Sequence, residues 1–64
     1  MTPDQSQAVW ELRRQGFALQ ADEAERCWEE GEIYHLAKHM KLSKGIRALI
    51  ERCNRAVSFS SEHA

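Results

Sequence analysis

Turns and long apolar runs are scarce in this chain. It has one proline, three glycines and no Asn-Gly or Asp-Gly pair, so it offers few of the turns that join β-strands. No apolar stretch approaches the ~20 residues that a membrane-spanning helix needs. The amino terminus lacks the basic start and the apolar core of a secretory signal. We therefore expect no membrane segment and a cytoplasmic protein, in which the two cysteines are reduced.

Signatures of catalysis and of metal binding are also scarce. The sequence has no phosphate-cradling glycine loop, no nucleophile with an evident base, and little room for a substrate pocket. Cys27 and Cys53 fall on apolar helix faces, where a packed thiol is inert. His35 and His39 are four residues apart, but Cys27 lies too far along the helix to share an ion with them. We expect no enzyme, catalytic residue, cofactor, metal ion or small-molecule substrate.

The residues that are present favour helices. The chain is 42% hydrophobic and 30% charged, and Ala, Leu, Glu, Lys, Arg and Gln dominate it. We predict an all-α fold of three or four short helices, at about 3–15, 20–30, 32–40 and 43–58, arranged as a helical hairpin or a helix-turn-helix-like corner. Residues 1–59 would form a single small domain, and residues 60–64 a flexible tail.

Two of the predicted helices carry clear signals. Thr2-Pro3-Asp4-Gln5 has the cap, the first-turn proline and the first-turn acid of a helix start, and Gln5 can close a capping box. Gly16 can end that helix, with Phe17 folding back onto it. The last helix is capped by Ser43, and its apolar stripe predicts the core. That stripe consists of Ile46, Leu49, Ile50, Cys53 and Val57.

The apolar side of the central segment changes at Gly31. Small or apolar residues gather on one face before it, and Ile33, Leu36, Ala37 and Met40 gather on nearly the opposite face after it. Either the helix breaks at Gly31, which the preference of glycine for helix ends favours, or it runs through and uses its second face for another copy. Because so short a chain buries little core, we expect a homodimer.

Trp10 points away from the stripe of the first helix, at about 160° from Leu12. An outward tryptophan suggests an interface, since tryptophan is enriched among residues that dominate binding. We predict that partner contacts are made by Trp10, Arg14, Trp28 and Tyr34.

Charge is unevenly distributed along the chain. Residues 1–34 carry eight acids and three arginines, a net charge of −5, and residues 35–64 carry six bases and two acids, a net charge of +4. The asymmetry fits an anionic partner for the basic half, head-to-tail pairing of two copies, or two solvated faces.

Residues 36–43, Leu-Ala-Lys-His-Met-Lys-Leu-Ser, with Ile46 and Ile50, resemble the helix-turn-helix motif of small bacterial and phage regulators over about residues 33–53. Lys41 stands where that family usually has glycine, and Arg47 where it has an aliphatic residue. The resemblance implies DNA binding with residues 44–57 as the recognition helix. Base edges would meet Lys44, Arg47, Glu51 and Asn54, and phosphates would meet Lys38, Lys41 and Arg55.

Two functions therefore remain open. We favour a small non-enzymatic regulator, an inhibitor or adaptor that binds another protein, of a kind common among phage and mobile-element products. A DNA-binding transcriptional regulator is the alternative, although a sequence pI near 6.3 is low for phosphate binding.

Overall fold

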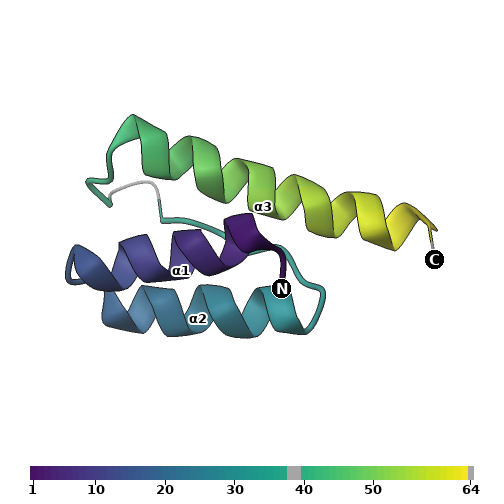
Figure 1. Cartoon of the computed structure of the whole chain (residues 1–64), viewed down its shortest axis with the longest axis horizontal. Coiled ribbons are helices and arrows are strands. Elements are labelled where there is room, and N and C mark those ends of the chain that lie inside the picture. The colour runs from purple at the N-terminus through teal and green to yellow at the C-terminus, as the bar shows by residue number, and fades with distance from the viewer. Residues whose placement is uncertain (38–39, 64) are drawn as a thin grey trace.

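The computed structural model describes the backbone of residues 1–37 and 40–63, and the side chains of these residues as far as Val57. It contains three helices, α1 (Pro3–Arg14), α2 (Ala18–Glu29) and α3 (Lys44–His63), and no strand in the part described. The all-α prediction is confirmed. α1 runs antiparallel to both other helices, so α2 and α3 run in the same direction (Figure 1).

The start of α1 follows its sequence signal. The Thr2 hydroxyl accepts a hydrogen bond from the Gln5 amide at 3.1 Å, and Gln5 Oε1 accepts one from the Thr2 amide at 2.9 Å. Gln5 is also buried, and its Nε2 donates to the Cys53 carbonyl at 3.4 Å. The predicted capping box is confirmed, and the same side chain also ties α1 to α3.

Two glycines end α1 and α2 in the same way. Gly16 and Gly31 have φ of +94° and +76°, a left-handed conformation that side chains with a Cβ disfavour. The amide after each glycine donates to the carbonyl five residues back, at 2.9 Å after Gly16 and 2.7 Å after Gly31. The predicted stop at Gly16 is confirmed. Of the two alternatives for the central segment, the structure has the break at Gly31 that the sequence favours, and not one continuous helix.

Residues 30–43 connect α2 to α3, and we call them the linker. One prediction about this segment is wrong. A helix was predicted over 32–40, but residues 32–37 and 40–43 form no helix, and Lys38 and His39 lie outside the described residues. The physical reason is a tertiary contact, because Asn54 of α3 binds both the amide and the carbonyl of Tyr34. The chain must return along the length of α2, about 18 Å for 12 residues, before α3 can begin (Figure 1).

α3 begins where the sequence predicts. Ser43 Oγ accepts a hydrogen bond from the Ile46 amide at 3.4 Å. The helix continues to His63, five residues past its predicted end at 58. Residues 60–63 of the predicted flexible tail thus have a helical backbone, and Ala64 lies outside the described residues.

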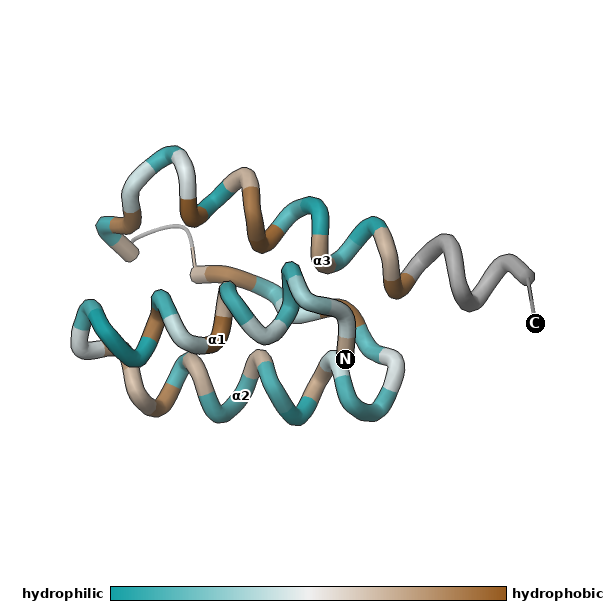
Figure 2. The backbone as a smooth tube through the Cα atoms, viewed as in Figure 1, coloured by the Kyte–Doolittle hydropathy of each residue, from teal (hydrophilic) through white to brown (hydrophobic). Residues whose placement is uncertain are grey.

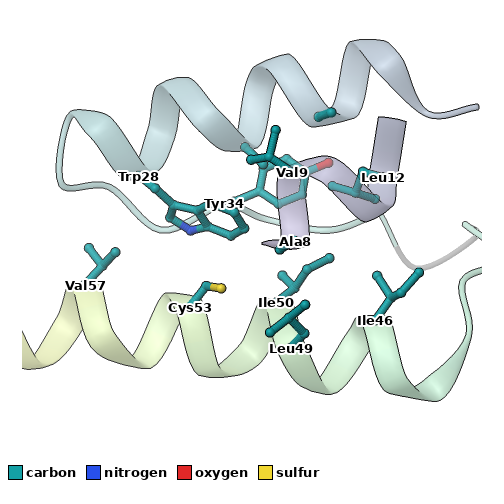
Figure 3. Close-up of a cluster of buried hydrophobic side chains, with 12 residues drawn as sticks. Ala8, Val9, Leu12, Trp28, Tyr34, Ile46, Leu49, Ile50, Cys53 and Val57 are labelled. Carbon is teal, nitrogen blue, oxygen red and sulfur yellow. The ribbon is translucent and has the colours of Figure 1, made fainter. Parts of the chain in front are cut away.

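The core lies between the three helices and the linker. The apolar side of α3 faces α1 (Figure 2), and the predicted stripe of α3 is buried throughout. Figure 3 shows how these side chains meet those of the other elements. The core cluster comprises Ala8, Val9, Leu12, Ala21, Ala24, Trp28, Tyr34, Ile46, Leu49, Ile50, Cys53 and Val57. Within the described residues, none of the helices combines the length and the apolar content that crossing a membrane requires.

Candidate protein-interaction surface

Trp10 lies on the outer side of α1. The buried residues of that helix are Gln5, Ala8, Val9 and Leu12, and Trp10 is 58% exposed. The predicted outward orientation is confirmed. Each of the other aromatic side chains that the structure describes is buried or half-buried. Among the described aromatic side chains, only Trp10 is exposed to solvent.

Arg14 braces this indole ring. Its guanidinium carbon lies 5.4 Å from the centre of the Trp10 ring, and its Nη1 lies 4.0 Å from Glu11 Oε1. A cation–π contact at an exposed site contributes about 0.5–1 kcal/mol, which limits the rotamers of Trp10 without burying it. The structure thus brings together two of the four predicted contact residues.

A shallow groove between α1 and α2 runs beside the indole. Its lining consists of Met1, Ser6, Val9, Trp10, Arg13 and Glu25. Arg13 Nη2 closes the α2 side, at 2.5 Å from Asp22 Oδ1 and 3.7 Å from Glu25 Oε1. Exposed ion pairs add little stability, but these pairs set a polar border next to an apolar floor. We call Met1, Val9, Trp10, Arg13 and Arg14 the Trp10 surface.

Trp28 and Tyr34 are placed differently from the prediction. Both are buried, with ring centroids 6.1 Å apart and ring planes at 79°, an edge-to-face contact. In this fold they offer no surface to a partner, because the linker folds over Trp28 and carries Tyr34 into the core. Of the predicted partner contacts, Trp10 and Arg14 remain.

Asn54 of α3 holds the linker in place. Its Oδ1 accepts hydrogen bonds from Trp28 Nε1 at 2.9 Å and from the Tyr34 amide at 3.0 Å, and its Nδ2 donates to the Tyr34 carbonyl at 2.9 Å. One side chain therefore joins α2, the linker and α3. The sequence gives no signal for this role, because Asn54 lies 20 residues from Tyr34 and 26 from Trp28.

The residues predicted to contact DNA lie in α3 and in the segment just before it, and they differ in exposure and in hydrogen bonding. Lys41, Lys44, Glu51 and Arg55 are exposed, and Lys38 lies outside the described residues. The other two are already engaged, since Asn54 holds the linker and the Arg47 guanidinium donates to the Met40 carbonyl. The non-helical residues 32–37 also leave the predicted recognition helix without the preceding helix that the resemblance implies.

The cysteine and histidine side chains that the structure describes form no metal-binding cluster. Cys27 and Cys53 are free thiols, and Cys53 is buried. Burial, together with the carboxylate of Asp4, raises the pKa of Cys53 to about 11, and Arg52 opposes that shift. Burial raises the pKa of Tyr34 as well, with smaller contributions from Glu23 and Cys27. Across the described residues, no three His, Cys, Asp or Glu side chains gather as a metal site would require, and His39 is outside that range.

No protein-family model matches this chain, and comparisons with curated proteins and with solved structures found no similar protein.

Proposed function

We propose that this chain is a small regulatory protein that acts without catalysis, by binding another protein through the Trp10 surface as an inhibitor or adaptor. The main observation that supports this proposal is the exposure of Trp10 in a fold that buries Trp28 and Tyr34. A small fold that buries Trp28 and Tyr34 but leaves the Trp10 indole exposed has apolar area to offer a partner.

The composition of the Trp10 surface favours an apolar contact surrounded by polar groups. The indole and Met1 supply exposed apolar area, and Val9 forms the floor of the groove. Arg13, held by Asp22 and Glu25, forms a polar border. Apolar centres with polar borders are the usual anatomy of protein interfaces. We therefore expect the partner to insert an apolar side chain beside Trp10.

The test is affinity capture from the native host with the wild-type protein and with Trp10→Ala. We expect the substitution to change the free energy of unfolding by less than about 0.5 kcal/mol, because the side chain is largely outside the core. Affinity for the captured partner should fall at least about tenfold, as for an interface anchor.

Leu19→Ala is the matched control. Leu19 is 75% exposed on α2 and does not line the groove, so its loss should leave partner binding unchanged. Capture of the same proteins, with the same affinity, by wild type and Trp10→Ala would contradict the proposal.

DNA binding is the second candidate, and the exposed bases near α3 favour it. Residues 40–57 carry five bases and one acid, a net charge of +4, and Lys44 and Arg55 lie on the side of α3 that faces away from the core. A mobility-shift assay with duplex fragments at about 50 mM salt should then give a complex that Lys44→Ala with Arg55→Ala abolishes. No shift for the wild-type protein would reject this function.

A further inference from the structure

A second surface surrounds the linker, away from Trp10. Three shallow grooves meet there, and Ile33 lines all three. Glu23 and Glu32 line the groove toward α2 together with Arg26, so its lining carries one net negative charge. Arg47 and Arg55 line the grooves toward α3 together with Glu51, so their lining carries one net positive charge. We call Ile33, His35, Glu23, Glu32, Arg47 and Arg55 the linker face. It shares no residue with the Trp10 surface.

The centre of the linker face is apolar because of the way Asn54 holds the chain. Asn54 binds both the amide and the carbonyl of Tyr34, and the Tyr34 side chain points into the core. In an extended chain successive side chains alternate in direction, so the neighbours on either side of Tyr34 point outward. Ile33 is accordingly 40% exposed, and His35 is exposed as well.

The two borders of the linker face have opposite charge. Residues 18–32, which include α2, carry six acids and one arginine, a net charge of −5. Residues 40–57 carry five bases and one acid, a net charge of +4. The ion pairs among described residues join α1 to α2 or lie within α1. The charges of α2 and α3 therefore flank the linker without neutralising each other across it.

In a dimer with a two-fold axis parallel to the helices, both charged borders would be paired at once. Rotation about such an axis, lying in the plane of contact, places the acidic border of each copy against the basic border of the other. The same rotation brings the two Ile33 side chains together at the centre. We propose that the linker face is a homodimer interface held by this reciprocal charge pairing.

Charge reversal tests the arrangement. Glu23→Arg with Glu32→Arg changes the net charge of residues 18–32 from −5 to −1, and Lys44→Glu with Arg55→Glu changes that of residues 40–57 from +4 to 0. Lys44 is included because it lies on the same row of α3 as Arg55. Each double variant thus removes most of the charge from one border. By sedimentation equilibrium, we expect the wild-type protein to dimerise, at least tenfold more weakly at 500 mM than at 20 mM salt. Each double variant alone should be monomeric, and their equimolar mixture should form a heterodimer.

Two further variants complete the experiment. Ile33→Ser keeps the charges and should weaken the dimer about tenfold, so it still tests the interface if a charge-reversed chain fails to fold. Trp10→Ala lies on the other surface and should dimerise as the wild type does. The proposal is overturned if the wild-type protein is monomeric at 1 mM and 20 mM salt or forms open oligomers. It is equally overturned if the mixture stays monomeric, or if Trp10→Ala abolishes the dimer.

Discussion

Asn54→Ala is expected to lower the free energy of unfolding by about 2–4 kcal/mol. The substitution removes three hydrogen bonds at once and leaves Trp28 Nε1, the Tyr34 amide and the Tyr34 carbonyl without their partner. Each polar group left unpaired in a protein interior costs about 1–3 kcal/mol, and the total is reduced here because Asn54 is half-buried and water can reach part of the site. Urea unfolding followed by tryptophan fluorescence would measure the change.

Arg52→Ala is the matched control for this substitution. Arg52 lies two residues before Asn54 on the same helix and is exposed, so its replacement should change stability by less than about 0.5 kcal/mol. A loss for Asn54→Ala no larger than that of the control would show that the linker is held by other contacts.

Raising the pH from 9 to 11 is expected to remove about 2 kcal/mol of stability through Cys53. Burial raises the pKa of this thiol from 9.0 to about 11, so the folded protein retains a proton that the unfolded chain releases. Stability falls wherever the native state binds more protons than the unfolded state. The contribution is complete below pH 9 and is lost as the pH rises through about 11; two pKa units correspond to about 2.7 kcal/mol.

The measurement is urea unfolding in reductant at pH 8 to 11. Tyr34, whose pKa is also raised by burial, adds a further loss in alkali, so the comparison must be made between variants. Cys53→Ala should be less stable at pH 8 because of the cavity it creates, but its stability should fall less steeply between pH 9 and 11. Cys27→Ala should keep the steep fall. Parallel curves for wild type and Cys53→Ala would contradict the assignment.

Local signals predicted most of the helical structure. The capping box at Thr2, the stops at Gly16 and Gly31 and the apolar stripe of α3 each depend on a few neighbouring residues, and each is confirmed. Such signals act through short-range geometry and hydrogen bonding, so the sequence alone suffices to read them.

The linker could not be predicted in the same way. Ile33, Leu36, Ala37 and Met40 have helical spacing, but a nine-residue helix has little intrinsic stability of its own. What holds the linker is Asn54, whose partners are distant in sequence. Tertiary contacts here override local preference.

The sequence predicted only part of the candidate surface, because the rest of that surface depends on tertiary contacts. The position of Trp10 on its helix fixes its outward direction, so periodicity identified it correctly. Trp28 and Tyr34 also looked available for a partner, but their burial depends on the course of the linker. The groove beside Trp10 depends on how α2 packs on α1, which helical periodicity does not describe.

The most direct test of the central claim, that the fold is complete without covering Trp10, is hydrogen exchange at the two indole N–H groups. Two-dimensional ¹H–¹⁵N spectra of the wild-type protein resolve them, and Trp10→Phe assigns them. Trp28 Nε1 donates to Asn54 in the interior, so its proton should exchange slowly. The Trp10 proton should exchange at nearly the rate of free indole in the isolated protein. Equal protection of both protons would mean that the protein covers Trp10 itself, and the proposed binding surface would not exist.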